Sequence, residues 1–325
     1  MREGFAPLCE WLAREDDFAI IAHVSPDGDT LGAGLALYMM LTARGKRAQV
    51  LCEHAVPAIY AFLPCAHMVT GLEAANPHYR NAIAVDCAAE DRMGKAAAVF
   101  HAADERANID HHGSNNGYGG YVFVDKRASA TGENIFLIYE AWRESFDSAL
   151  RRDIAVCLFV AVSTDTGNFA YSSTTPATLR VAAALMEEGI DIAQINRDVY
   201  KTISLGKARL QGFVLSTMRF FCENRIGVAC VALSDIKRLG AMVEDLEGMT
   251  DSIRDVDGVE IAIVLREKRE GGWKASLRSK RRADVSALAS GFGGGGHKHA
   301  AGCSTQGEMD TFYNALLRAA EQALH

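Results

Sequence analysis

"IIAHVSPDGDTLGAG", residues 20–34, places His23, Asp27 and Asp29 directly after an apolar run. The Pro-Asp-Gly tripeptide within it is typical of a turn, and the apolar residues that follow predict a helix with Asp29 or Thr30 as its N-cap. A strand that ended in an ordinary loop would need neither an imidazole nor two carboxylates at this point. The stretch therefore predicts a strand, a turn and a helix, and it marks three polar side chains as candidates for a functional site.

Short apolar runs alternate with helical stretches through the first half of the chain. The predicted strands span residues 18–24, 47–52, 81–86 and 105–110, and the predicted helices span residues 31–45 and 132–145. Residues 151–169 are apolar enough for a long buried helix or strand that breaks near Asp165. Strands separated by helices are typical of a parallel sheet with helices on both faces. The expected fold class is α/β.

The chain is long enough for two domains, each with its own hydrophobic core. Residues 1–189 form the predicted parallel-sheet domain, and residues 190–215 are more polar and helical, as expected of a helical linker. A second alternation of strands and helices follows in residues 216–325. It predicts a smaller α/β domain.

Composition restricts the kind of protein that this chain forms. Of its 325 residues 49% are hydrophobic and 23% are charged, which is typical of globular proteins, and no apolar run reaches the length of a transmembrane helix. The formal net charge of −7 argues against a surface that wraps long nucleic acid. Residues 266–282 depart from this balance with eight Lys or Arg and two Glu, so any contact with a polyanion is expected there.

The eight cysteines are scattered along the chain and form no CxxC pair. This pattern is typical of reduced, mostly buried thiols and argues against a zinc ribbon or knuckle. The first residues, MREGFAPLCEWLARED, include acidic side chains where a signal peptide has an uninterrupted apolar core. A cytoplasmic protein without a membrane segment is therefore expected.

Histidines and aspartates stand at the ends of several predicted elements. Because ligands of a parallel sheet bind at the carboxyl ends of its strands, we expect these side chains to converge. Carboxylate oxygen and imidazole nitrogen together suit Mn²⁺, Mg²⁺ or Zn²⁺, and two cations about 3.5–4 Å apart would neutralise the carboxylates and suit phosphoryl chemistry. The expected set is His23, Asp27, Asp29, Asp86, Asp110, His111, His112 and Asp165.

Four segments resemble the motifs of the DHH phosphoesterases, namely HVSPDGDTLGA, AVDC, IDHHGSN and STDTGNF. The later segment GGGGHKHAAG resembles the signature of the DHH-associated C-terminal domain. The resemblance covers nearly the whole chain, and its size and motif order are most similar to the bifunctional oligoribonuclease/PAP phosphatase (nanoRNase) branch. It implies an N-terminal parallel-sheet DHH domain linked to a smaller α/β substrate-binding domain.

The resemblance also implies two divalent metal ions, with Mn²⁺ favoured and Mg²⁺ or Co²⁺ as alternatives. One ion would be held by His23, Asp27 and Asp86, and the other by Asp29, Asp86, His111 and Asp165, with Asp86 as the bridge. It further implies that Asp110 orients a histidine through its ring N–H and that His112 faces the substrate phosphate.

In the C-terminal half, the sequence indicates capture of a phosphate or a nucleotide. Glycines let the backbone approach an anion closely, and an arginine offers a planar fork for a phosphate. The expected substrate-binding residues are Arg278, Gly294, Gly295, Gly296 and His297. A flexible linker is the competing interpretation of the glycine run.

The implied function is that of a two-metal phosphoesterase. Its substrates would be very short RNA or DNA oligonucleotides, hydrolysed to mononucleotides, and 3′-phosphoadenosine 5′-phosphate (PAP), hydrolysed to AMP and phosphate. A homodimer is left open by the sequence.

Four alternatives are weighed against this function. A family II inorganic pyrophosphatase would have a different C-terminal half from GGGGHKHAAG, and a RecJ-type single-strand exonuclease would need room for a further strand-binding domain. A cyclic dinucleotide phosphodiesterase often carries membrane and sensory segments, which are not found here. A non-catalytic nucleotide-binding sensor is disfavoured because the set of metal ligands is intact.

Overall fold

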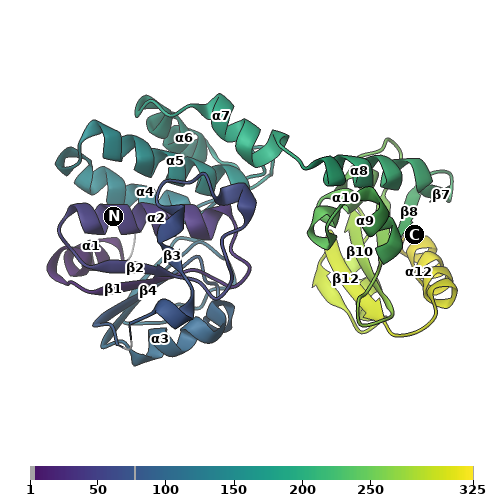
Figure 1. Cartoon of the computed structure of the whole chain (residues 1–325), viewed down its shortest axis with the longest axis horizontal. Coiled ribbons are helices and arrows are strands. Elements are labelled where there is room, and N and C mark those ends of the chain that lie inside the picture. The colour runs from purple at the N-terminus through teal and green to yellow at the C-terminus, as the bar shows by residue number, and fades with distance from the viewer. Residues whose placement is uncertain (1–3, 77, 325) are drawn as a thin grey trace. The chain divides into compact units, whose positions relative to one another are not determined.

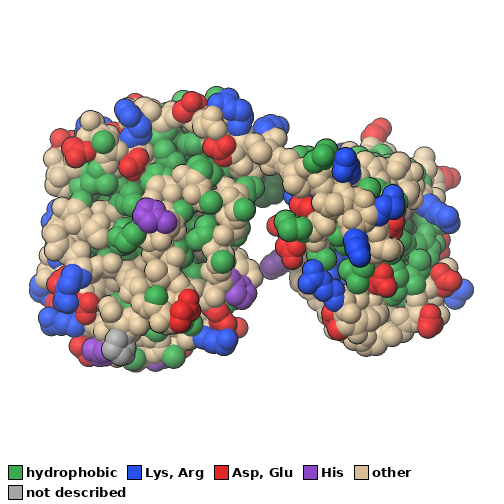
Figure 2. All heavy atoms as spheres, in the orientation of Figure 1, with side chains coloured by type: hydrophobic (Ala, Val, Ile, Leu, Met, Phe, Trp, Pro, Cys, Tyr) green, Lys and Arg blue, Asp and Glu red, His purple; other side chains and the backbone are tan. Residues whose placement is uncertain are grey.

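The computed structural model describes residues 4–76 and 78–324. These residues fold into two compact units that divide between Thr202 and Ile203 (Figure 1 and Figure 2). Each unit contains a six-stranded sheet with helices packed against it. The predicted α/β fold class is therefore confirmed.

A parallel sheet forms the centre of the first unit. Its strands follow the spatial order β3-β2-β1-β4-β5-β6, and every neighbouring pair is parallel. The strands are β1 (Phe18–Ile21), β2 (Ala48–Leu51), β3 (Val69–Thr70), β4 (Asn81–Val85), β5 (Glu105–Asp110) and β6 (Tyr121–Val124). Because β1, β4 and β5 are neighbours, the residues that follow them meet at the same end of the sheet.

Helices cover both faces of this sheet. They are α1 (Phe5–Arg14), α2 (Gly28–Ala43), α3 (Ala97–Ala102), α4 (Thr131–Trp142), α5 (Ser148–Asp165), α6 (Pro176–Glu187) and α7 (Ile192–Asn196). Figure 1 shows α2 and α4 to α6 on one side of the sheet and α3 on the other. Alternate residues of β1 accordingly enter two separate hydrophobic clusters, Phe18 and Ile20 in one and Ala19 and Ile21 in the other.

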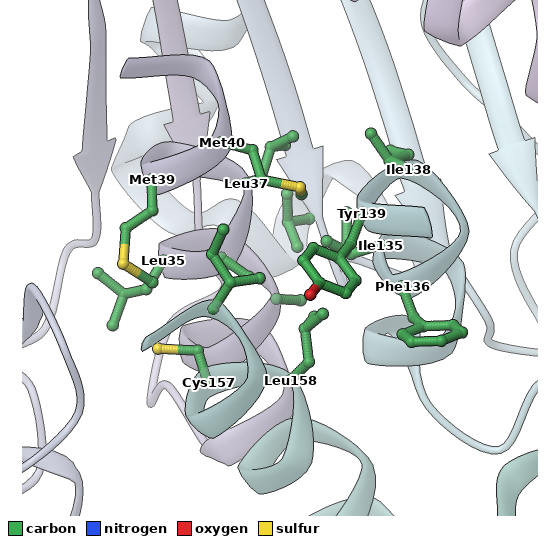
Figure 3. Close-up of a cluster of buried hydrophobic side chains, with 14 of the residues drawn as sticks. Leu35, Leu37, Met39, Met40, Ile135, Phe136, Ile138, Tyr139, Cys157 and Leu158 are labelled. Atoms are coloured by element: carbon green, nitrogen blue, oxygen red, sulfur yellow. The ribbon is translucent and has the colours of Figure 1, made fainter. Parts of the chain in front are cut away.

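Helices α2 and α5 pack closely because α2 carries glycine where they touch. A Cβ atom at Gly32 would overlap the carbonyl oxygen of Cys157, and one at Gly28 would overlap the side chain of Thr164. The two glycines lie four residues apart and therefore on one side of the helix. Side chains of α2, α4 and α5 fill the adjoining core, which Figure 3 shows from within.

The four strands predicted in the first half are present as β1, β2, β4 and β5. The sequence left open whether residues 151–169 form a helix or a strand; most of them belong to α5, which begins at Ser148 and ends at Asp165. Strands β3 and β6 were not predicted; β3 has only two residues, and β6 is a four-residue strand at the edge of the sheet.

The predicted N-cap of α2 is wrong. Asp27 caps the helix, because its carboxylate Oδ1 accepts hydrogen bonds from the backbone N–H groups of Asp29 and Thr30, both at 3.1 Å. Helix α2 therefore begins within the Pro-Asp-Gly turn, and Asp29 already lies in its first turn.

The second unit is built on a mixed sheet in the spatial order β11-β12-β10-β9-β8-β7, in which β8 and β9 pair in parallel. Its strands are β7 (Arg219–Phe221), β8 (Ile226–Val231), β9 (Ile261–Glu267), β10 (Trp273–Ser279), β11 (Gly295–His297) and β12 (Ala300–Thr305). Its helices are α8 (Leu205–Thr217), α9 (Leu233–Leu239), α10 (Met249–Arg254), α11 (Val285–Ser290) and α12 (Met309–Ala323). Side chains of α8 to α10 form one cluster with β8 and β9, and those of α11 and α12 form another on the opposite face.

Residues 190–215, expected as a helical linker, are shared between the units. They include α7 of the first unit and most of α8, whose Leu210 and Val214 pack against Ala229 and Val231 of β8. Across the described ranges, no helix combines the length and the apolar character that crossing a membrane requires.

Candidate metal centre

The ligand atoms of the predicted site lie together where β1, β4 and β5 end. Three overlapping groups bring one ligand atom of each member within 4.8 Å of the others. These groups are His23, Asp27 and Asp86; Asp29, His111 and Asp165; and Asp86, His111 and His112. The structure thus assembles all eight of the predicted residues around one place, because Asp110 contacts His112.

The first group points a free imidazole nitrogen at two carboxylates. His23 Nε2 lies 3.4 Å from Asp27 Oδ2 and 3.5 Å from Asp86 Oδ2. His23 Nδ1 lies 2.8 Å from the carbonyl oxygen of Val24, which can only accept, so this nitrogen carries the ring proton of the neutral form. Nε2 is thereby left as the lone-pair donor, as a metal-binding histidine requires.

The second group repeats this arrangement. His111 Nε2 lies 3.0 Å from Asp165 Oδ2 and 3.9 Å from Asp29 Oδ2, while His111 Nδ1 faces the carbonyl oxygen of Ala128 at 3.3 Å. Nε2 is buried and forms no hydrogen bond with any described residue. A buried nitrogen lone pair aimed at two carboxylates is the geometry of a ligand, not of a packing residue.

Asp86 reaches both groups with different oxygens. Its Oδ2 faces His23, and its Oδ1 lies 3.7 Å from His111 Nε2. The residue has a φ of +59°, a left-handed conformation that costs free energy in any residue but glycine and that clusters at functional sites. The chain turns sharply here, immediately after β4, and carries one carboxylate to a position between two ligand groups.

Helix α4 holds two of the carboxylates through its N-terminus. The backbone N–H groups of Thr131 and Gly132 donate to Asp29 at 2.6 and 2.8 Å, and the Thr131 hydroxyl donates to Asp86 at 2.8 Å. Unpaired N–H groups and the helix dipole make this end of a helix favourable for negative charge. No role was predicted for Thr131 from the sequence. Its position directly before the predicted helix 132–145 was the local signal that could have indicated one.

Burial and mutual repulsion dominate the electrostatics of this centre. Burial, together with the nearby carboxylates of Asp86, Asp165 and Asp27, raises the pKa of Asp29 well above its usual range. Burial raises the pKa of Asp86 too, although its contact with His23 opposes the rise. Two neighbouring buried carboxyl groups whose pKa values are both raised indicate a missing positive charge.

The pKa values of the two histidines also indicate a missing positive charge. Burial lowers the pKa of His23, but Asp27 and Asp86 outweigh it and raise the pKa to about 10. Burial also lowers the pKa of His111, and Asp165 outweighs it to raise the pKa to about 9. Without a metal, the carboxylates therefore attract protons onto nitrogens that are placed as ligands. The donor set, the orphaned His111 Nε2 and this charge deficit all fit divalent cations.

Asp110 and His112 form a separate pair beside the ligands. His112 Nδ1 lies 2.8 Å from Asp110 Oδ1, and this contact raises the pKa of His112. Asn115 donates to Asp110 Oδ2 at 2.6 Å and thereby fixes the carboxylate. With Nδ1 engaged, His112 can present only Nε2 to another molecule, and its side chain is 43% exposed. The sequence motif contained Asn115, but no role was predicted for it.

His54, to which the sequence analysis assigned no site role, lies next to the first motif. Its Nδ1 accepts a hydrogen bond from the backbone N–H of Ser25 at 3.0 Å, and Ser25 has a φ of +55°. The contact stabilises a turn between His23 and Asp27. The two partners are 29 residues apart in the chain, so no local pattern could have revealed them.

The predicted substrate-binding residues lie together on the sheet of the second unit. Ala300 of β12 pairs with both Arg278 of β10 and His297 of β11, so these three residues form one row across neighbouring strands. Residues paired in this way point to the same face of a sheet. Arg278 Nε also lies 3.4 Å from Asp251, so its guanidinium already has one carboxylate neighbour.

The three glycines in this segment have different surroundings. A Cβ atom at Gly294 would overlap the carbonyl oxygen of Gly302, and one at Gly296 would overlap that of Ala300, so both are needed for β11 to approach β12. A Cβ atom at Gly295 would meet nothing. Gly295 is therefore the glycine that leaves open space on the sheet, beside the row of Arg278 and His297.

Comparisons with known proteins agree with this architecture. Residues 17–162 match the sequence model of the DHH family, N-terminal domain, and residues 226–325 match that of the DHHA1 domain. The chain is 33% identical over 314 residues to the bifunctional oligoribonuclease and PAP phosphatase NrnA of Thermus thermophilus, which covers 96% of this chain and 91% of that protein. The NrnA protein of Bacillus subtilis is 22% identical over 297 residues, 91% of this chain and 92% of its own length.

A solved structure shares the whole architecture. The crystal structure of an exopolyphosphatase-related protein from Bacteroides fragilis superimposes with a TM-score of 0.89 at 26% identity. The match covers 98% of this chain and 96% of that one.

Divalent cations should stabilise the folded chain through the metal centre. At a concentration about 100 times its Kd, Mn²⁺ should raise Tm by about 5–10 °C in thermal unfolding followed by circular dichroism. Asp86→Asn should abolish most of this rise, because Asp86 reaches both ligand groups, whereas Asp257→Asn, at an exposed aspartate of the second unit, should keep it. An equal rise in the Asp86→Asn variant would show that the cation binds elsewhere.

The rise in Tm caused by Mn²⁺ should also depend on pH. Metal binding has to displace protons from His23 and His111, whose pKa values are raised to about 10 and 9. The affinity for Mn²⁺, measured by calorimetry, should therefore increase from about pH 6 to about pH 8.

Proposed function

The chain belongs to the DHH phosphoesterase family, and on this premise we propose that it hydrolyses very short oligonucleotides to mononucleotides and PAP to AMP and phosphate. The observation that carries the proposal is the pairing of two ligand groups through the two oxygens of Asp86. The second support is the row of Arg278 and His297 on neighbouring strands of the second sheet, where both side chains could reach a phosphate.

We propose Mn²⁺ as the metal at both ligand groups. His23, Asp27 and Asp86 would hold one ion, and Asp29, Asp86, His111 and Asp165 the other. Bound there, two divalent cations would lower the pKa of a water molecule and neutralise charge that develops on the phosphoryl group. The contribution of the chain is to fix the ligands: Val24 and Ala128 set the two ring tautomers, and α4 holds Asp29.

His112 would bind the phosphate in this arrangement. Asp110 holds its Nδ1 and favours the protonated ring, so Nε2 would donate a hydrogen bond to a phosphate oxygen or to the leaving oxygen. Asp110 itself would be a positioning residue, because its two carboxylate oxygens are engaged by His112 and Asn115.

The second unit would hold the rest of the substrate. Arg278 and His297 flank Ala300, and the next row consists of Ser276, Gly302 and Gly295, which offer almost no side-chain bulk. A flat floor of small residues beside the Arg278 guanidinium and the His297 imidazole suits a phosphate with an attached nucleoside. The compartment we propose is the cytoplasm, since all eight cysteines are free thiols.

The preferred substrate should be short. The chain has a net charge of −7, and its dense basic segment is confined to residues 266–282, so few phosphates of a long strand can be neutralised. With Mn²⁺, kcat/KM should be higher for a dinucleotide than for a strand of about 20 nucleotides, and activity should fall only modestly as salt is raised.

The same assay separates the alternatives. Labelled oligonucleotides of increasing length, PAP, a cyclic dinucleotide and pyrophosphate should be compared under identical conditions. Faster processive degradation of the long strand would favour a RecJ-type exonuclease, and preference for the cyclic dinucleotide or for pyrophosphate would favour those two enzymes. Binding without turnover of any of them would favour a sensor.

Substitutions in the second unit should change substrate affinity more than turnover. Arg278→Ala and His297→Ala should each raise KM for the dinucleotide by about tenfold or more, the cost of losing a charge-assisted hydrogen bond. Lys298→Ala is the matched control, because Lys298 is an exposed cation next to His297 in the chain. Unchanged KM values in both site variants would remove this surface from the proposed function.

A further inference from the structure

Tyr171 is a large aromatic side chain that stands in solvent beside the metal centre. It is 62% exposed and follows the ligand Asp165 by six residues. Its ring lies against Gly167, where a Cβ atom would overlap the ring atoms. Because consecutive Cα atoms are about 3.8 Å apart, Gly167 lies within about 7.6 Å of Asp165. The ring thus contacts the backbone next to a metal ligand, and the residue is largely exposed to solvent.

The turn that carries Tyr171 is strained and firmly held. Gly167, Asn168 and Phe169 have φ values of +55°, +56° and +65°, three left-handed residues in succession. The N–H of Asn168 donates to the Ser163 carbonyl oxygen at 2.7 Å, and the N–H of Tyr171 donates to that of Thr166 at 2.9 Å. Backbone strain of this kind costs free energy and persists where a particular geometry is needed.

The fold itself makes little use of the Tyr171 side chain. Within residues 4–76 and 78–324, no group hydrogen-bonds to its hydroxyl, and it belongs to none of the hydrophobic clusters. Phe169, two residues earlier, packs against Phe159 with ring centroids 5.7 Å apart and anchors the turn in the core. The turn therefore buries one aromatic ring and presents the other.

We propose that Tyr171 is a stacking platform for a nucleobase of the substrate, the base attached to the phosphate that lies at the metal centre. This inference rests on the proposed function. The cations that the carboxylates would hold, and the imidazole of His112, would recognise phosphate but not a base. An exposed aromatic ring stacks on any base, because every base has a π-face, and so adds affinity without sequence preference.

Steady-state kinetics with Mn²⁺ and two substrates test this role. The substrates are a dinucleotide and the same molecule without its bases. Tyr171→Ala should raise KM for the dinucleotide by about 5- to 150-fold and leave KM for the abasic molecule unchanged. Tyr171→Phe, which keeps the ring, should behave like the unchanged chain with both substrates. Equal losses with both substrates, or no loss with either, would overturn the inference.

A binding measurement, which needs no turnover, tests the stacking role of Tyr171 separately from the proposed hydrolysis. AMP and ribose 5-phosphate should be titrated into the Mn²⁺-loaded chain in a calorimeter. The unchanged chain should bind AMP more tightly, and the difference should disappear in Tyr171→Ala. If no substrate is hydrolysed but this difference is seen, the proposed function fails while the base platform stands; equal affinities in the unchanged chain would overturn the platform.

Discussion

Carboxylates that repel one another are the constraint on which the first unit depends. Asp29 and Asp86 are buried side by side at the end of the sheet, and their pKa values are raised because neither can ionise without cost. The surrounding structure supplies partial positive charge: the N-terminus of α4 donates to Asp29, and imidazoles face Asp86 from two sides. The proposed cations would complete the neutralisation that the chain begins.

Close packing decides where these charges meet. Because Gly28 admits the Thr164 side chain and Gly32 admits the Cys157 carbonyl group of α5, the first turn of α2 and the last residue of α5 come together. Asp29 and Asp165 can therefore share one histidine. A larger residue at either glycine would separate the two helices. The motif that looks catalytic in the sequence is therefore also a packing motif, and its glycines contribute as much as its aspartates.

The two units present different kinds of surface. The first buries a dense set of charges and leaves one aromatic ring, that of Tyr171, exposed beside them. The second offers a row that contains the Arg278 guanidinium and the His297 imidazole next to a floor of small residues. In the proposed function, the first unit performs the chemistry and the second holds the substrate.

The sequence by itself determined the α/β class, the positions of four strands in the first half, and the polar residues at strand ends, because apolar runs and the polar residues that follow them are local patterns. The grouping of His23 with Asp86, and of Asp29 with Asp165, came from the family resemblance, and the structure brings both groups together. Thr131 could not be predicted, since its contacts with Asp29 and Asp86 join positions 102 and 45 residues apart.

Only the tertiary structure decided the role of the first acidic pair. Capping preferences allow Asp29 to begin α2, but its carboxylate is taken by the N–H groups of α4, a helix that is distant in the chain. Asp27 caps α2 instead and still reaches His23. A local rule failed here because a hydrogen bond across the fold competed for the same side chain, and such a partner becomes visible only when the chain is folded.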